Sequence, residues 1–384
     1  MKKVIARFSV VFAAIVVGLT LVYLLAFLGD KSSGPAENLL NSLNRSVFEL
    51  EEEYILKNKS ESRAQRLKWL GASLRNKDTL QSLNRFLLGA YDHRVDISLQ
   101  PILDLEDSLR TTFPLIHIYT AWGSKKEQRF PAEKIRAITT LGSIPVVTWE
   151  PWLNDFTGGE NQGIPTGQDP NKGGLKRIVV GKYDTYIRQW AEEAKDSGVT
   201  LLLRLGHEMN DPYRYPWGPQ NNQPEDYIAA WKHVVGIFRE LKADNVLWIW
   251  APHLAYGELE AFFPGADWVD WISTGTLNYG TVAPWSQWWS FEEIFGKHYP
   301  ELESYQKPIL IAEFGSLSVG GNRSEWYGEA LKNFKTRFPM VKSLLLFHHG
   351  NDNSTTYQSL DWTIQRDQEV LDTLRKYLPE ILEK

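Results

Sequence analysis

Two glutamates, Glu208 and Glu313, each follow an apolar run that is typical of a buried β-strand. Residues 201–205 lead into the first glutamate, and residues 308–312 lead into the second. A carboxylate at the end of a buried strand is costly unless the protein uses its charge. Two of them, far apart in the sequence, suggest an acid/base group and a nucleophile that meet at one end of a parallel barrel.

Cleavage of a glycosidic bond requires two such carboxyl groups. One is protonated and gives its proton to the leaving oxygen, while the other is ionised and attacks the anomeric carbon or activates water. We expect Tyr279 to hydrogen-bond Glu313 and hold it as the anion, and His207 to crowd Glu208 and favour its protonated form. A structural salt bridge is the alternative interpretation of either glutamate, and Arg204 is then the expected partner of Glu208.

Side-chain alternation predicts which face of each strand carries the glutamates. On the first strand Arg204, Gly206 and Glu208 share one face and three leucines share the other. On the second strand Glu313 shares a face with Ile311. We therefore expect both glutamates to point into the barrel at its mouth.

Polar and aromatic side chains follow most of the other predicted strands, where they can contact a sugar. From these strand ends we predict substrate contacts by Tyr119, Trp149, Glu150, Trp152, His207, Asn210, Tyr279 and His348. Glu150 is interpreted as a hydrogen-bond acceptor for the substrate. Loop tryptophans that we expect to stack on sugar rings are Trp152, Trp217, Trp285, Trp288 and Trp289. The Trp248 and Trp250 pair alternates on one strand face and predicts core packing.

Neither a metal nor a cofactor is expected. The chain has eight histidines but no His-Glu-x-x-His or comparable ligand spacing, and it has no cysteine. The 16 tryptophans suggest a ligand groove. A net charge of -5 argues against a general nucleic-acid partner, which would favour a basic protein.

Eight strand-then-helix units predict a (β/α)8 TIM barrel. The predicted strands cover residues 86–91, 115–120, 144–149, 200–205, 246–250, 271–277, 309–312 and 342–347. Helices are predicted near residues 131 and 258 and over residues 183–197, 224–242, 291–305, 325–338 and 367–382. A doubly wound open sheet is the alternative, but no Gly-rich phosphate loop follows the first strand.

Residues 8–28 are almost wholly apolar and carry no charge, which is long enough for a transmembrane helix. Lys2, Lys3 and Arg7 precede this segment and favour a cytoplasmic N-terminus. We therefore predict an uncleaved signal anchor in residues 1–30, with the catalytic domain on the outer side of the cell membrane. A cleaved signal peptide, which would release a secreted protein, is the alternative.

Residues 31–84 are predicted to form a linker and a short helical stalk, with helices over residues 37–57 and 62–74, ahead of a barrel domain over residues 85–384. The stalk is interpreted either as a coiled coil that docks a partner or as a spacer packed on the main domain. The apolar stripe covers few heptads, which favours the spacer.

The segment Arg204-Leu-Gly-His-Glu-Met-Asn210, followed by Tyr215-Pro-Trp217, resembles the acid/base motif of glycoside hydrolase family 26, the β-mannanase family. Ile311-Ala-Glu-Phe-Gly315 is similar to the nucleophile strand of that family, and residues 149–152, 250–252 and 278–279 fit its pattern. The resemblance covers residue 86 to the C-terminus.

This resemblance implies a retaining, endo-acting enzyme on a β-linked polysaccharide. It makes Glu208 the acid/base and Glu313 the nucleophile, with Arg204 and His207 shaping the site. One departure is that the eighth strand ends in two histidines, where related enzymes place a tryptophan under the sugar. We expect Trp362 to replace that tryptophan, or the sugar preference to differ from mannan.

Two functions follow from these expectations. The first is a membrane-anchored glycosidase that trims an exopolysaccharide and works beside its export machinery. The second is a non-catalytic glycan-binding or scaffold protein of the same export system, built on a hydrolase fold.

Overall fold

The computed structural model describes residue 18 and residues 52–165, 167–356 and 358–382. The chain divides into two compact units, Met1–Ile55 and Leu56–Lys384. The predicted anchor lies outside the described residues apart from Gly18, as does the predicted stalk helix before residue 52. Within the described ranges, no helix has both the length and the apolar character needed to span a bilayer.

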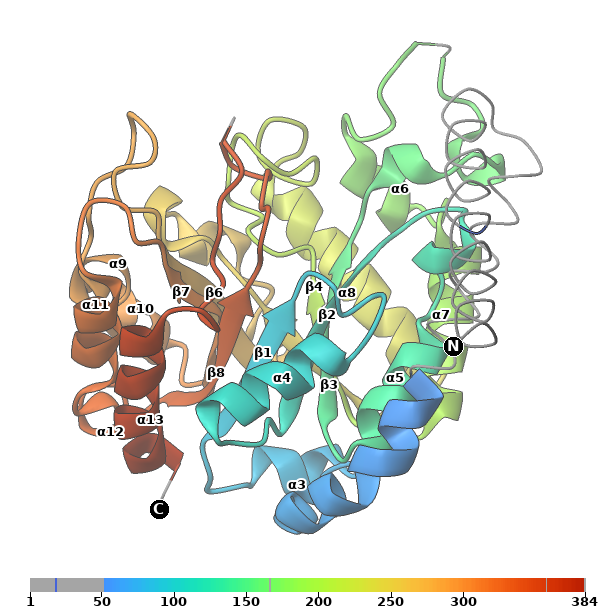
Figure 1. The fold of residues 1–384 in the computed structure, drawn as a ribbon. Coiled ribbons are helices and arrows are strands. Elements are labelled where there is room, and N and C mark those ends of the chain that lie inside the picture. Colours follow the sequence, from blue (N-terminus) through green and yellow to red (C-terminus); the bar gives the residue numbers. More distant parts are fainter. Residues whose placement is uncertain (1–17, 19–51, 166, 357, 383–384) are drawn as a thin grey trace. The chain divides into compact units, whose positions relative to one another are not determined.

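Eight parallel strands of the second unit close into a barrel in sequence order (Figure 1). They are β1 (Leu87–Asp92), β2 (Leu115–Ala121), β3 (Ile144–Glu150), β4 (Leu201–Leu205), β5 (Val246–Trp250), β6 (Trp271–Asn278), β7 (Ile309–Ser316) and β8 (Val341–His348). Each strand overlaps its predicted range, so the predicted (β/α)8 barrel is confirmed.

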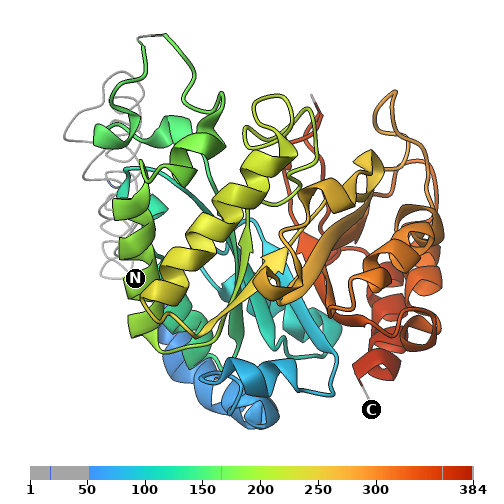
Figure 2. The ribbon, with the colours of Figure 1, turned by 180° about the vertical axis from the view of Figure 1, so that it is seen from behind.

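Helices surround the strands on the outside of the barrel (Figures 1 and 2). Residues 52–66 are also α-helical, and the α-helices after them are α3 (Lys77–Gln81), α4 (Gln100–Leu109), α5 (Ala132–Thr140), α6 (Gly174–Val179), α7 (Asp184–Ser197), α8 (Pro224–Glu240), α9 (Phe291–Ile294), α10 (Tyr299–Ser304), α11 (Arg323–Leu331), α12 (Phe334–Arg337) and α13 (Gln368–Leu382). Amphipathic spacing explains the long ones, because their apolar stripes are buried against the strands.

Three predicted helices differ from the structure. The helix near residue 258 is a 3-10 turn, Leu259–Phe262. The helix over residues 291–305 is split by a 3-10 turn, Gly296–His298. The helix over residues 325–338 breaks between α11 and α12, because Asn333 adopts a left-handed backbone with φ 55° that an α-helix cannot contain.

Apolar side chains fill the lower half of the barrel. They are Leu87, Leu115, Ile144, Val146, Leu202, Leu247, Ile249, Trp271, Leu310, Ala312 and Leu345. Leu70 and Leu80, which precede β1, pack into the same cluster. This part of the predicted stalk therefore packs on the barrel, while its role as a spacer or as a docking coiled coil and the domain boundary at residue 85 stay predictions.

A buried ion pair also fastens the segment before β1 to the barrel. Arg63 is fully buried and pairs with Glu106 of α4. Its guanidinium also donates to Ser143 Oγ at 2.7 Å and to the Leu141 carbonyl at 3.1 Å. Because the lower half is sealed in this way, the open end of the barrel is the one where the strands finish.

Candidate active site

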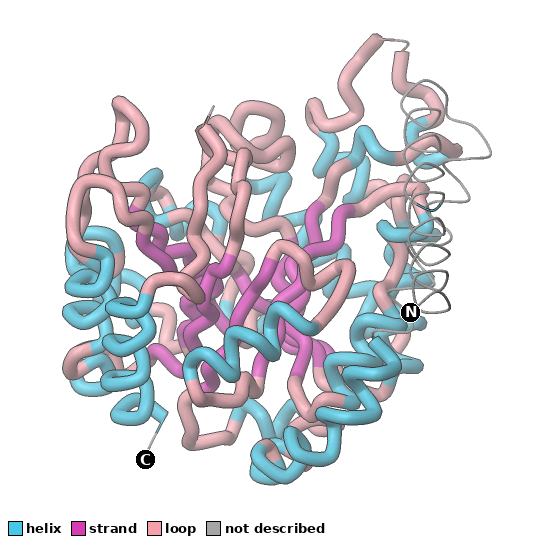
Figure 3. The backbone as a smooth tube through the Cα atoms, viewed as in Figure 1, coloured by secondary structure: helices cyan, strands magenta, loops and turns pink. Residues whose placement is uncertain are grey.

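A cavity of about 950 Å³ opens at the carboxyl ends of the strands. The longer loops lie at this end, at the top of Figure 3. Side chains that line the cavity and come from the strands or directly follow them are Tyr91, Tyr119, Glu150, Glu208, His253, Leu277, Tyr279, Glu313, Phe347 and His349. The two glutamates that stand out in the sequence therefore share one cavity.

Glu313 reaches the cavity through an irregularity in β7. Leu310 and Ala312 already face the barrel interior, so strict alternation would turn Glu313 outward. The pairing of β7 shifts register on both sides at this point, with Ile311 opposite Thr274 and Glu313 opposite Gly275. The extra residue turns Glu313 inward. The predicted direction of Glu313 is confirmed, but the predicted shared face with Ile311 is wrong.

The Glu313 carboxylate has two close partners. Arg204 Nη1 lies 2.7 Å from Oε1, and the Tyr119 hydroxyl donates to the same oxygen at 2.8 Å. Burial alone would raise the pKa of Glu313, but the charge and hydrogen bond of Arg204 and the hydrogen bond of Tyr119 outweigh it and lower that pKa. Glu313 is therefore held as the anion.

These contacts correct two expectations. Arg204 pairs with Glu313, and the salt bridge to Glu208 that the alternative interpretation offered is not found in the described part of the chain. Tyr279 lines the cavity, but its hydroxyl contacts Thr355 Oγ1 at 3.3 Å, so the predicted bond to Glu313 is made by Tyr119 instead. The pleat of β2 points Tyr119 into the barrel, as it does His117.

Glu208 lies just beyond β4 in a left-handed turn. Gly206 has φ 49° and Glu208 has φ 51°, a conformation that is rare for a residue with a side chain. The Glu208 backbone N–H donates to the Ala251 carbonyl at 2.6 Å, which ties the turn to the end of β5. Such strained positions cluster at functional sites. The turn, rather than continued strand alternation, aims Glu208 at the cavity.

The two carboxyl groups lie close to each other beside Gly275 of β6. A Cβ atom built on Gly275 would lie 3.3 Å from Glu313 Oε2 and 3.7 Å from Glu208 Oε1. These two oxygens are therefore no more than about 7 Å apart, because both distances start from one point. This bound includes the ~5 Å separation of retaining glycosidases and excludes most of the ~6.5–9.5 Å range of inverting ones.

Glu150 is a third carboxyl group in the cavity. Its Oε2 accepts a hydrogen bond from Trp152 Nε1 at 3.0 Å. Burial raises the pKa of Glu150 to about 7, with the nearby charges of Glu313 and Glu208 acting in the same direction. The role of Glu150 as a hydrogen-bond acceptor for the substrate stays a prediction, and below about pH 7 its carboxyl can donate a hydrogen bond as well.

His207 contacts both sides of the site. Its Nε2 lies 3.0 Å from the Tyr215 hydroxyl, and its Nδ1 lies 3.8 Å from Glu150 Oε1. Burial and the nearby cations Arg204 and Arg214 hold the pKa of His207 well below its usual range, so the imidazole is neutral. His207 lines the cavity as predicted.

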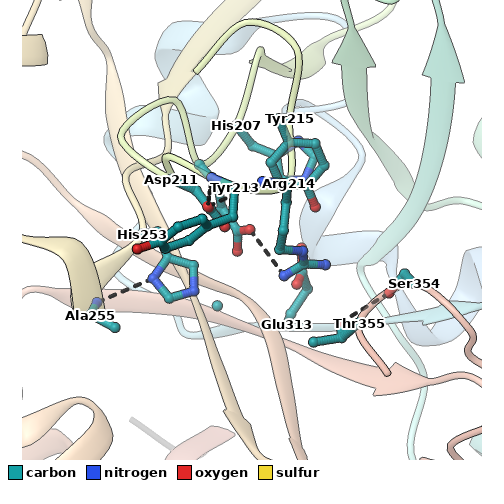
Figure 4. A network of polar contacts seen from close by, with 12 residues as sticks. His207, Asp211, Tyr213, Arg214, Tyr215, His253, Ala255, Glu313, Ser354 and Thr355 are labelled. Carbon is teal, nitrogen blue, oxygen red and sulfur yellow. Dashed lines mark hydrogen bonds and ion pairs between the residues drawn. The ribbon is translucent and has the colours of Figure 1, made fainter. Parts of the chain in front are cut away.

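Arg214 was not singled out in the sequence. It projects from the loop after β4, and Figure 4 shows its guanidinium directed toward Glu313. Its Nη1 lies 3.5 Å from Glu208 Oε2, and the guanidinium lies over the Tyr215 ring at 5.2 Å. A residue in a polar loop belongs to no helix or strand pattern, so the sequence gives no sign that Arg214 lies in the site. Only the folded loop shows that its side chain reaches Glu208.

Two predicted sugar contacts are turned away from the cavity by their strands. Trp149 precedes the inward-facing Glu150, so it points outward and packs in the core, where its ring stacks on Trp190 at 4.4 Å. His348 likewise points away from the cavity and its Nδ1 lies 2.7 Å from Asp92 Oδ2. Both predictions of substrate contact are therefore corrected.

Three further residues that were predicted to contact the substrate are buried and contact other residues of the site instead. Trp217 is buried and donates from Nε1 to the His207 carbonyl at 2.7 Å. Asn210 is buried and bonds the backbone of His253 in both directions, at 2.9 and 2.8 Å. Trp362 is fully buried beneath Tyr279, with ring centroids 5.0 Å apart. None of the three is among the residues that line the cavity.

The loop tryptophans divide into two groups. Trp152, Trp285 and Trp289 line the cavity, and Trp285 is 60% exposed and free to stack on a ligand. Trp288 packs against Gly321 instead. Trp248 and Trp250 are buried, which confirms the predicted core pair. At the end of β8, Phe347 and His349 line the cavity where a tryptophan was expected.

No described group of three His, Cys, Asp or Glu side chains is arranged to hold a metal ion. The site presents instead one ionised carboxylate, a second carboxyl within about 7 Å and aromatic walls. That arrangement can break and form acetal bonds without a cofactor.

Comparison with known proteins agrees with this chemistry. Residues 152–298 match the model of glycosyl hydrolase family 26. Endoglucanase H of Acetivibrio thermocellus is 34% identical over 249 residues, which are 62% of this chain and 25% of that protein. Mannan endo-1,4-beta-mannosidase A and B of Caldalkalibacillus mannanilyticus is 23% identical over 231 residues, 56% of this chain and 42% of that protein. The chain thus spans less than half the length of these relatives.

The fold is also found in solved structures. A GH26 beta-mannanase from Bacteroides ovatus superposes with a TM-score of 0.56 at 14% identity, over 80% of this chain and 92% of that one. At this identity the likeness concerns the fold. The chain is therefore similar to glycosyl hydrolase family 26 over residues 152–298, and it shares the barrel fold of that β-mannanase.

Proposed function

We propose that the protein is an endo-acting, retaining glycosidase that hydrolyses a β-linked polysaccharide, with Glu313 as nucleophile and Glu208 as acid/base. The observation that carries the proposal is the Glu313 carboxylate, which Arg204 and Tyr119 contact and which lies within about 7 Å of a second carboxyl group.

The reaction proceeds in two steps. Glu313 attacks the anomeric carbon while Glu208 gives its proton to the leaving glycosidic oxygen, which forms a covalent glycosyl–enzyme. Water then attacks the same carbon, gives its proton to Glu208 and releases Glu313. Arg204 and Tyr119 keep Glu313 ionised before the attack, and the neutral His207 beside Glu150 is placed to contact a sugar hydroxyl.

Mannan and β-glucan are the two substrate classes that we propose first. One relative is named an endoglucanase and another a mannan endo-1,4-beta-mannosidase. At the end of β8 the cavity is lined by Phe347 and His349. The family resemblance implies a tryptophan under the sugar at this place, so the sugar contacts differ here. The glycan therefore has to be found by experiment.

The test is a screen of the purified full-length chain against β-mannan, glucomannan, mixed-linkage β-glucan, cellulose oligosaccharides and β-xylan. Proton NMR of the first product distinguishes retention from inversion at the anomeric carbon. Glu208→Gln and Glu313→Gln are each expected to abolish turnover, while Glu225→Gln, an exposed position on α8, is the matched control. Full activity in either active-site variant would refute the role of that residue.

A negative screen would also be informative. If no glycan yields product but one of them binds, the non-catalytic glycan-binding alternative is favoured.

We also propose that residues 1–30 anchor the enzyme and that the barrel works outside the membrane, beside an exopolysaccharide exporter. The support is the uncharged apolar run over residues 8–28 and the basic residues before it. Carbonate extraction of membranes, combined with protease treatment of intact cells, tests this topology. Release of the chain by carbonate, or protection of the barrel from protease, would contradict it.

A further inference from the structure

Arg214 belongs to the wall of the cavity, and its loop is fixed by hydrogen bonds. Asp211 Oδ1 accepts hydrogen bonds from the backbone N–H groups of Tyr213 at 2.7 Å and Arg214 at 3.2 Å, which fixes the loop. The Arg214 side chain lines the cavity and is 25% exposed, so its charge is largely removed from bulk water. Its position is thus set by the fold rather than by a flexible surface loop.

Two arginines face the two carboxyl groups that we propose as catalytic. Arg204 pairs with Glu313 at 2.7 Å, and Arg214 faces Glu208 at 3.5 Å. Asp352 also lines the cavity, but its carboxylate accepts hydrogen bonds from Trp362 Nε1 and the Ser354 backbone, each at 2.9 Å.

During catalysis Glu208 carries a proton and therefore no negative charge, so the pairing of two arginines with two carboxylates is lost. The inference rests on the proposed function, in which Glu208 must be protonated when the substrate is bound. A guanidinium does not lose its proton under these conditions. With Glu208 neutral, Arg204 and Arg214 share the negative charge of Glu313, and a largely buried cation without a full counter-charge is unfavourable. An anion brought by the substrate would restore the pair.

We propose that Arg214 recognises a carboxylate on the glycan, so that the preferred substrate is a β-linked polysaccharide with an acidic sugar beside the cleaved bond. The planar guanidinium suits a carboxylate, which it binds through two parallel N–H donors. The long contact to Glu208 leaves most of its donors available to a ligand. A neutral mannan or glucan would bring no negative charge to this cation.

A matched pair of polymers tests the proposal with the full-length chain. Glucomannan is oxidised at part of its C6 positions to give uronate residues, and a portion is reduced again so that both polymers share one processing history. We expect kcat/KM to be on the order of tenfold higher for the oxidised polymer, a typical effect of one charge-assisted pair. Arg214→Met should bring this ratio to about one, since it removes the charge but keeps an unbranched side chain.

Lys297→Met is the control, because Lys297 is another cation of the cavity wall but lies over the Trp289 ring. It should keep the preference for the oxidised polymer. A wild-type ratio near one, or a ratio that survives in Arg214→Met, would overturn the proposal.

Binding gives a second readout that needs no hydrolysis. Calorimetric titration of Glu208→Gln, which mimics the protonated carboxyl, should show a stronger preference for oxidised oligosaccharides than the wild type does. The double variant Glu208→Gln/Arg214→Met should lose that preference. If no polymer is cleaved but this pattern is found, the hydrolase proposal fails and the recognition of a carboxylate stands; equal binding of both oligosaccharides would refute the recognition itself.

Discussion

Tyr119→Phe isolates one of the two contacts that keep Glu313 ionised. The substitution removes the hydroxyl that donates to Glu313 Oε1 at 2.8 Å and leaves Arg204 in place. A hydrogen bond to a charged group contributes about 1.5–3 kcal/mol. One pKa unit corresponds to about 1.36 kcal/mol, so the pKa of Glu313 should rise by roughly one to two units.

The pH dependence of kcat/KM measures this change in the free enzyme. Glu313 must be ionised to attack, so activity falls as the pH drops through its pKa, which the two partners hold below the usual range. Loss of one partner raises that pKa, and the acidic limb of the profile should move upward by about one to two pH units. Tyr91→Phe is the control, because Tyr91 lines the same cavity and its ring contacts Tyr119 at 4.8 Å. An acidic limb of Tyr119→Phe that coincides with the wild type would refute the reasoning.

Three further changes follow from the structure. Glu150→Gln should remove a decline of kcat/KM above about pH 7, because the raised pKa of Glu150 lets it ionise there and add a negative charge to the site. Gly275→Ala should lower kcat by about tenfold without unfolding the protein, because its Cβ would crowd Glu313 Oε2 at 3.3 Å. Arg63→Met should lower the free energy of unfolding by about 3–5 kcal/mol in urea titrations, because Glu106 would stay buried without its partner.

For each of these three predictions, one experimental result would contradict it. An unchanged alkaline limb in Glu150→Gln would mean that this carboxyl does not titrate in the working range. Wild-type kcat in Gly275→Ala would show that the two glutamates do not need their present spacing, and Gly328→Ala on α11 is its control. Equal stability losses in Arg63→Met and in Arg66→Met, an exposed position, would argue against the buried ion pair.

The sequence predicted the barrel well because the strand signal is local. Apolar runs such as residues 246–250 are long enough to indicate strands by themselves, and their regular alternation with helices predicts parallel order. The direction of Glu150 also follows from this, since its neighbour Trp149 packs in the core on the other face of β3. The choice of Trp149 as a sugar contact ignored that alternation.

The residues that pair with the two glutamates could not be predicted from local sequence patterns. Tyr119, Arg204 and Glu313 come from three strands that are distant in the sequence, and their contact depends on strand register and on the bulge in β7. Tyr279 was an equally reasonable partner from the sequence, because it also follows a strand end. Only the contacts formed in the folded chain separate the two tyrosines.

The sequence by itself determined the class of chemistry and the frame that carries it. Two strand-end glutamates, abundant tryptophan and eight alternating units are properties of residue type and spacing, which need no folded contacts to be recognised. The tertiary structure decided which groups act on those glutamates. Charge effects depend on distance and burial, so only the fold could place Arg204 on Glu313, Arg214 beside Glu208, and Glu150 where burial raises its pKa.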